Sequence, residues 1–148
     1  MVIICNDSFN DYKNYDMYFN YYKNFDLSNF QKWAIKAIVD NNHILVTAHT
    51  GSGKTLPAEF AIQYYVNKGK KVIYTAPIKA LSNTKLHDLR KKYPNISFGI
   101  ITGDITDNPE ADVLIMTTEI LPYTLNNRKI NDLSNTDIKL NFEINIET

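Results

Sequence analysis

The order of apolar and polar positions predicts helices that alternate with short strands. A first helix is expected over residues 28–40, where Ser28 followed three positions later by Gln31 matches a capping box. Its apolar residues recur at helical spacing and form one stripe: Phe30, Trp33, Ala34, Ala37 and Ile38. Further helices are predicted over residues 56–67, 78–93 and 118–125.

Short apolar runs with β-branched residues predict buried strands between these helices. They cover residues 43–48, 71–76, 96–101 and 112–117. This alternation predicts an α/β fold with a parallel sheet and helices on both faces. Such sheets bind ligands at the carboxyl ends of their strands, so the loops after the four strands are expected to share one edge. These loops are residues 47–55, 76–79, 102–104 and 117–119.

Length and composition narrow the possible classes of protein. The 148 residues are enough for one domain at most, with a core that needs no disulfide or metal. Sixteen basic residues balance sixteen acidic residues, so any binding of nucleic acid would require a local groove. The single Cys5 argues against a disulfide framework. The apolar opening residues are too few to span a membrane and lack a signal-peptide charge, so we expect an intracellular protein without a membrane partner.

Residues 1–24 form an extension rich in Tyr and Asn, in which aromatic residues are interspersed with Asn, Asp and Lys. This composition leaves two alternatives. The tyrosines could stack on the bases of single-stranded nucleic acid, or they could pack against the edge of the domain. We favour packing.

The stretch T-A-H-T-G-S-G-K-T, residues 47–55, predicts a phosphate-binding loop. Its glycines allow backbone N–H groups to close on phosphate oxygens, Lys54 can reach the β- and γ-phosphates, and the Thr55 hydroxyl is a candidate ligand of Mg²⁺. Lys54 and Thr55 are therefore the catalytic candidates. The candidate residues of the whole loop are Ala48, His49, Thr50, Gly51, Ser52, Gly53, Lys54 and Thr55.

The loops at the predicted sheet edge resemble those of the DExH-box RNA helicases of superfamily 2, of the superkiller type that serves the RNA exosome. In that family the phosphate loop commonly begins with A-H-T, as at residues 48–50, and the next loop reads P-I-K-A-L-S-N, as at 77–83. A T-G-D at 102–104 is followed by N-P at 108–109, and M-T-T-E-I-L stands at 116–121. The combination of these motifs is specific.

The resemblance covers about residues 25–125 and implies part of a RecA-like, P-loop domain over 25–127 that binds ATP and Mg²⁺. Gln31 would read the adenine edge, since its amide offers a donor and an acceptor together, or it would serve only the capping box. Phe25 would stack on the base, or it would anchor the chain that enters the helix.

The resemblance also implies a groove for single-stranded RNA, contacted without reading its base sequence. Its candidate residues are Pro77, Lys79, Ser82, Asn83, Thr102, Gly103, Thr117, Thr118 and Glu119. Further partners implied are the remainder of the helicase and an RNA-degrading complex.

The acidic D-E-x-H motif that hydrolyses ATP in this family is absent from the chain, as is the second RecA-like domain. Residues 128–148 instead form a tail or insertion, in which alternating apolar residues at 138–146 predict a half-exposed strand. We therefore expect the N-terminal fragment of an ATP-dependent RNA helicase, inactive alone and with a sheet incomplete at its C-terminal side. The alternative is a nucleotide- or RNA-binding module that hydrolyses nothing. A DNA-unwinding helicase is a third alternative, against which the motifs at 77–83 and 116–121 argue.

Overall fold

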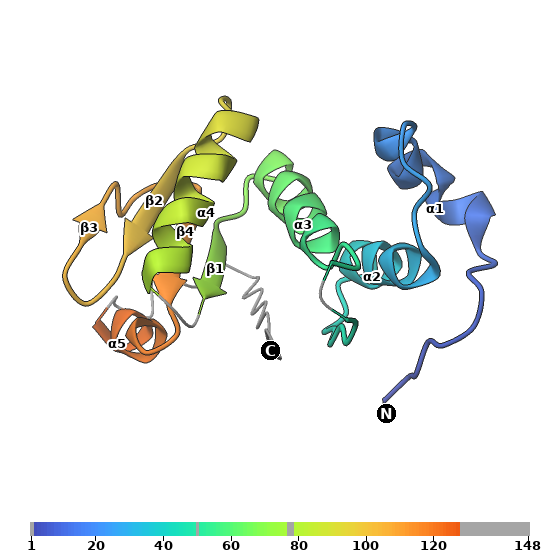
Figure 1. The fold of residues 1–148 in the computed structure, drawn as a ribbon, viewed down its shortest axis with the longest axis horizontal. Coiled ribbons are helices and arrows are strands. Elements are labelled where there is room, and N and C mark those ends of the chain that lie inside the picture. The colour runs from blue at the N-terminus through green and yellow to red at the C-terminus, as the bar shows by residue number, and fades with distance from the viewer. Residues whose placement is uncertain (1, 50, 77–78, 128–148) are drawn as a thin grey trace. The chain divides into compact units, whose positions relative to one another are not determined.

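The computed structural model describes residues 2–49, 51–76 and 79–127 (Figure 1). They belong to two compact units, the first within residues 1–61 and the second within 62–146. The boundary lies inside helix α3 (Thr55–Asn67). Each unit is described by itself.

The first unit contains α1 (Tyr12–Phe19), a 3₁₀ turn (Asn20–Tyr22) and α2 (Asn29–Val39), followed by the start of α3. Helix α2 confirms the predicted helix and its capping box, because the Ser28 N–H donates to Gln31 Oε1 at 3.0 Å. Its buried apolar residues are Ala34, Ile35 and Ile38.

The apolar stripe of α2 differs in part from the predicted one. Ile35, which the stripe omitted, is fully buried, whereas Trp33 is only half-buried. The reason lies in the residues before the helix, because the Trp33 ring packs edge-to-face against Phe9, with ring centres 5.0 Å apart. Helix α2 therefore has two apolar sides, one of which faces residues of the N-terminal extension.

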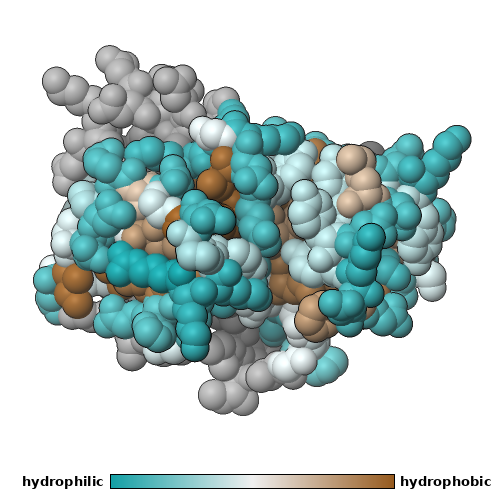
Figure 2. Space-filling view, turned by 90° about the horizontal axis from the view of Figure 1, so that it is seen from above, coloured by the Kyte–Doolittle hydropathy of each residue, from teal (hydrophilic) through white to brown (hydrophobic). Residues whose placement is uncertain are grey.

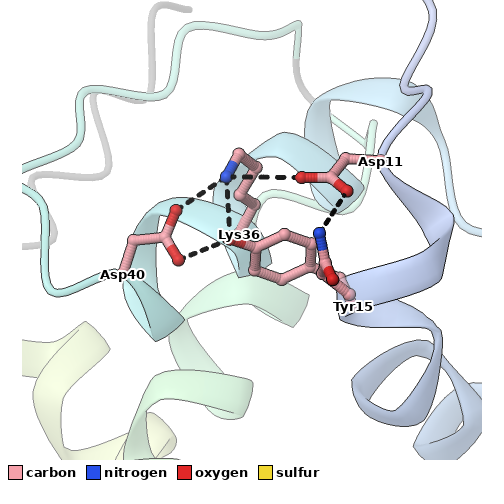
Figure 3. A network of polar contacts seen from close by, with 5 residues as sticks. Asp11, Tyr15, Lys36 and Asp40 are labelled. Atoms are coloured by element: carbon pink, nitrogen blue, oxygen red, sulfur yellow. Dashed lines mark hydrogen bonds and ion pairs between the residues drawn. The ribbon is translucent and has the colours of Figure 1, made fainter.

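A polar network joins the same extension to the end of α2 (Figure 3). The Lys36 ammonium donates to Asp40 Oδ2 at 2.7 Å and to the Tyr15 hydroxyl at 2.8 Å. The Tyr15 hydroxyl in turn donates to Asp40 Oδ1 at 2.5 Å. Burial alone would raise the pKa of Asp40, but the hydrogen bonds from Lys36 and Tyr15 outweigh it and lower this pKa from its ordinary 3.8.

The variant Asp40→Asn is expected to lower the melting temperature at pH 7 and to lower it by less at pH 3. Because the folded pKa of Asp40 lies below 3.8, its stabilisation is fully present above that pH and is lost as the pH falls through the folded pKa. We expect a loss of about 1 kcal/mol, roughly 4–8 °C for a small domain. Thermal melts followed by circular dichroism check this, with the exposed Asp26→Asn as control. An equal loss at both pH values would contradict it.

The buried strand predicted over residues 43–48 is wrong. These residues are neither helix nor strand, and Leu45 is 86% exposed. A run of apolar and β-branched residues forms a strand only where a neighbouring strand supplies hydrogen-bond partners. In the described part of the chain, the ladders join other strands and leave residues 43–48 unpaired.

The second unit is built around a four-stranded sheet. Its elements are β1 (Val72–Ala76), α4 (Lys79–Lys92), β2 (Phe98–Ile101), β3 (Thr106–Asp107), β4 (Val113–Thr117) and α5 (Ile120–Asn127). The strand order is β1-β4-β2-β3, in which β1, β4 and β2 are parallel and β3 is antiparallel to β2. The sheet is mostly parallel and is combined with helices, so the predicted α/β fold class is confirmed.

Strands β1, at one edge of this sheet, and β4, next to it, are covered on both faces. Every residue of β1 and β4 is buried, as is usual for parallel strands with other elements packed on each side. Helix α4 contacts β1, β2 and β4. Ile73, Leu114 and Met116 form a buried cluster, against which Leu121 of α5 packs.

The surface view in Figure 2 shows mainly hydrophilic residues, with hydrophobic residues singly or in small groups between them. Among the described residues, no helix has both the length and the apolar character needed to cross a membrane.

Candidate nucleotide site and candidate RNA groove

The predicted phosphate loop has a backbone that only glycine adopts easily. Gly51 and Gly53 have φ angles of +80° and +88°, in the left-handed region. The loop turns on itself, because the Ser52 N–H donates to the His49 carbonyl oxygen at 3.3 Å, and α3 begins directly afterwards at Thr55. A helix N-terminus presents free N–H groups and a positive dipole end, which favour an anion. Thr50 lies outside the described residues.

Two side chains of this loop fit a phosphate group. The Lys54 ammonium donates to the carbonyl oxygen of Ala48, so it lies across its own loop and contacts an oxygen that a phosphate oxygen could replace. The Ser52 hydroxyl is buried and has no hydrogen-bond partner among the described residues. A buried hydroxyl without a partner costs free energy, which an anion in the loop would recover.

Gln31 connects helix α2 to the phosphate loop. Its Oε1 accepts from the Ser28 N–H at 3.0 Å, and its Nε2 donates to the Gly53 carbonyl oxygen at 3.1 Å. The capping role of Gln31 is therefore confirmed. One lone pair of Oε1 and one hydrogen of Nε2 are not used by these two bonds, and together they match the donor and acceptor of an adenine edge. The adenine role stays a prediction.

The Phe25 ring is 69% exposed, so it is not packed as an anchor for the chain that enters α2. Its backbone N–H closes a turn by donating to the Tyr22 carbonyl oxygen at 2.8 Å. The exposed ring is compatible with stacking on a base, which stays a prediction.

Three of the four predicted edge loops share one edge of the sheet. Because β1, β4 and β2 are parallel, their carboxyl ends lie together, with Ala76 opposite Thr117 and Ile101 opposite Met116. The Thr118 N–H donates to the Ala76 carbonyl oxygen at 3.2 Å and ties two of these loops to each other. The fourth loop follows residues 43–48, which are not part of this sheet.

The candidate RNA residues differ in how accessible they are. Thr102 is 5% exposed and orders its own turn, because its hydroxyl oxygen accepts from the Ile105 N–H at 3.2 Å. Thr117 is 2% exposed, and its hydroxyl has no hydrogen-bond partner among the described residues. The exposed candidates are Asn83, Gly103, Thr118 and Glu119. Lys79 and Ser82 lie in α4, and Pro77 lies outside the described residues.

The bond between Gln31 and Gly53 is the feature of the site that the sequence did not indicate. The two residues are 22 positions apart, and no local pattern connects them. The contact is tight, because a Cβ atom at Gly53 would lie 2.5 Å from Gln31 Nε2. A side chain at position 53 would therefore displace the Gln31 amide, in addition to straining a backbone with positive φ.

A comparison with known families agrees with this geometry. The model of the DEAD/DEAH box helicases matches residues 28–139, which is most of the chain and includes the phosphate loop and the sheet edge. The chain belongs to the DEAD/DEAH box helicase family. Similar proteins are mRNA transport homolog 4 of Caenorhabditis elegans, 49% identical over 100 residues, and the antiviral helicase SKI2 of Saccharomyces cerevisiae, 47% identical over 97 residues. The human exosome RNA helicase MTR4 is 46% identical over 97 residues.

These alignments cover 66–68% of this chain but only 8–10% of each relative. The chain thus spans about a tenth of the length of the curated relatives that it matches. The names and identities confirm the resemblance to DExH-box helicases of the superkiller type that the motifs indicated.

Proposed function

We propose that this DEAD/DEAH box helicase chain provides the ATP-binding loop and part of the RNA groove of an intracellular ATP-dependent RNA helicase. The observation that carries the proposal is the phosphate loop, in which Lys54 contacts a carbonyl oxygen of the loop and the Ser52 hydroxyl is buried without a partner among the described residues. Both groups are suited to an anion at the N-terminus of α3.

The parts of the nucleotide would be held by different residues. Lys54 and the loop N–H groups would bind the phosphates, and the Thr55 hydroxyl would be a ligand of Mg²⁺. When bound, Mg²⁺ neutralises charge on the β- and γ-phosphates. Gln31 would read the adenine edge with its remaining donor and acceptor, and Phe25 would stack on the base.

RNA would bind at the edge formed by the ends of β1, β2 and β4. Asn83, Gly103, Thr118 and Glu119 are exposed there, with one carboxylate and no basic group among them. Their amide, hydroxyl and backbone groups suit sugar and phosphate contacts without base readout. By analogy with the relative named an exosome RNA helicase, an RNA-degrading complex and the remainder of a helicase are the proposed partners.

A module that binds nucleotide or RNA without hydrolysis is the second candidate. It would need no D-E-x-H motif, and the 148 residues given contain none. The two candidates share a fold and differ in catalysis alone.

The 148-residue chain is expected to bind ATP–Mg²⁺ weakly and to release no phosphate. The reason is a phosphate loop that fits an anion, without the acidic motif that positions the attacking water. Calorimetric titration measures binding, and a phosphate-release assay measures turnover. Turnover that exceeds the background of a Lys54→Ala variant would contradict the prediction.

RNA binding by the chain is expected to be weak and to fall only shallowly with salt. The exposed groove candidates are mostly uncharged, so few counterions would be released. We expect a slope of log affinity against log salt of about −1 to −3, at roughly 0.7 per phosphate contacted on a single strand. Anisotropy titrations with labelled poly-U and with a mixed-sequence RNA check the slope. A steeper slope, or a strong preference for one sequence, would argue against this groove.

A further inference from the structure

We propose that residues 7–22, the N-terminal arm, form a positioning element of the nucleotide site that holds Gln31 against the phosphate loop through helix α2. The arm precedes residues 28–139, which the family model matches. The proposal deepens the proposed function and rests on the phosphate loop being an ATP site.

The arm bonds directly to the turn of α2 that contains the capping box. The Phe9 N–H donates to Asn29 Oδ1 at 3.1 Å, and Asn29 is the first residue of the helix, next to its cap Ser28. One turn later, the Trp33 indole N–H donates to the Asp7 carbonyl oxygen at 2.9 Å. These bonds fix the backbone of the arm to the end of the helix that carries Gln31.

The arm also holds the opposite end of α2. Figure 3 shows the Tyr15 hydroxyl between the ammonium of Lys36 and the carboxylate of Asp40, with Asp11 on the other side of the ammonium. The Lys36 Nζ lies 4.4 Å from the centre of the Tyr15 ring and 3.8 Å from Asp11 Oδ2. A helix held at both ends has little freedom to tilt or slide.

Aromatic packing fills the space between these two attachments. The Phe9 side chain is 3% exposed, and its ring packs edge-to-face against Tyr12, Tyr15, Phe19 and Trp33, with ring centres 5.0–6.2 Å apart. Tyr15 and Phe19 are buried as well. Because Phe9, Tyr15 and Phe19 are buried inside the first unit, these three rings are not available to stack on RNA bases, and we assign the arm to support rather than to RNA binding.

Gln31 transmits the position of α2 to the phosphate loop. Its side chain is 8% exposed, and its amide is bonded at one end to the helix cap and at the other to the Gly53 carbonyl. Gly53 lies between Ser52 and Lys54, the two residues suited to phosphate. Movement of α2 would therefore break the bond to Gly53 and loosen the loop at the point where it binds an anion.

A double-mutant cycle in the 148-residue chain tests whether the arm acts through Gln31. Phe9→Ala, Gln31→Ala and the double variant are titrated with a fluorescent ribose-labelled ATP in the presence of Mg²⁺. We expect Phe9→Ala to weaken binding by about fivefold when Gln31 is present and to have no effect in the Gln31→Ala chain. An equal loss in both chains would mean general damage to the fold, and no loss in either would mean no link; each result would overturn the proposal.

Hydrogen exchange without nucleotide gives a second readout that does not depend on the proposed function. The amides of residues 51–54 are expected to exchange about fivefold faster in Tyr15→Phe, which keeps the buried ring and removes only the hydroxyl. The control Tyr21→Phe, at a side chain 74% exposed, and the amides of β1 and β4 are expected to remain unchanged. Tyr15→Phe also tests the proposal if Phe9→Ala unfolds the first unit.

The two readouts separate the possible failures. Faster exchange at residues 51–54 without ATP binding to the unmodified chain would leave the arm as a support of the loop and refute the proposed function. ATP binding together with unchanged exchange in Tyr15→Phe would refute the arm as a positioning element. A loss of poly-U binding in Phe9→Ala with unchanged ATP affinity would also refute the positioning role. It would indicate instead that the arm binds RNA.

Discussion

Replacing Lys54 with alanine is expected to weaken ATP–Mg²⁺ binding by about 10- to 150-fold. The substitution removes a charge-assisted contact to the phosphates, worth about 1.5–3 kcal/mol. The ammonium already contacts an oxygen in the ligand-free loop, the carbonyl of Ala48, so it needs little rearrangement to contact a phosphate oxygen. Calorimetric titration of the chain with ATP–Mg²⁺ and with ADP–Mg²⁺ measures the loss for each nucleotide.

The matched control is Lys91→Ala, which removes an exposed lysine from the last turn of α4. It changes the net charge by the same amount as Lys54→Ala and is expected to leave the affinity for nucleotide unchanged. Equal losses in the two variants would mean that the lysines act through general charge. The phosphate loop would then lose its assigned role.

Local signals in the sequence were sufficient for most helices and strands. Ser28 and Gln31 marked the start of α2, and the helix predicted over 56–67 corresponds to α3, after which Gly69 turns the chain with a φ of +72°. β1 and β4 were predictable because strands buried on both faces have continuous apolar runs. Each of these features depends on residues that are neighbours in the chain.

The errors concern features that depend on distant residues. The run at 43–48 has the composition of a strand, but composition does not supply the neighbouring strand that a ladder requires. Helix α1 was not predicted, because its residues have no clean period and are ordered by rings such as Phe9 and Trp33. In the site, the loop residues were predictable from their motif, whereas the bond from Gln31 to Gly53 was not.

The chain that returns from β3 packs closely against Gly99 of β2. Asn108, with a φ of +48°, brings the chain back from β3 so closely that a Cβ atom at Gly99 would lie 2.0 Å from the Asn108 carbonyl oxygen. The Arg90 guanidinium holds the same region from α4, since it donates to the Phe98 carbonyl oxygen at 2.7 Å and to Asp107 Oδ2 at 2.8 Å. The atoms nearest to the new Cβ belong to the backbone, so no flexible side chain can move aside to make room.

The variant Gly99→Ala is therefore expected to destabilise the second unit by about 3 kcal/mol, the upper end of the usual cost of overpacking. The added methyl group would separate β2 from the returning chain and stretch the bonds from Arg90. The control Gly103→Ala adds the same methyl group two residues after β2, at a position where no atom lies within 4 Å of the new Cβ, and is expected to change stability by less than about 0.5 kcal/mol. Urea denaturation followed by circular dichroism measures both, and hydrogen exchange at β2 and β4 assigns the loss to this unit. Similar midpoints for the two variants would mean that the chain around Asn108 moves away without cost, and the close packing of β2 against it would then contribute little to the stability of the sheet.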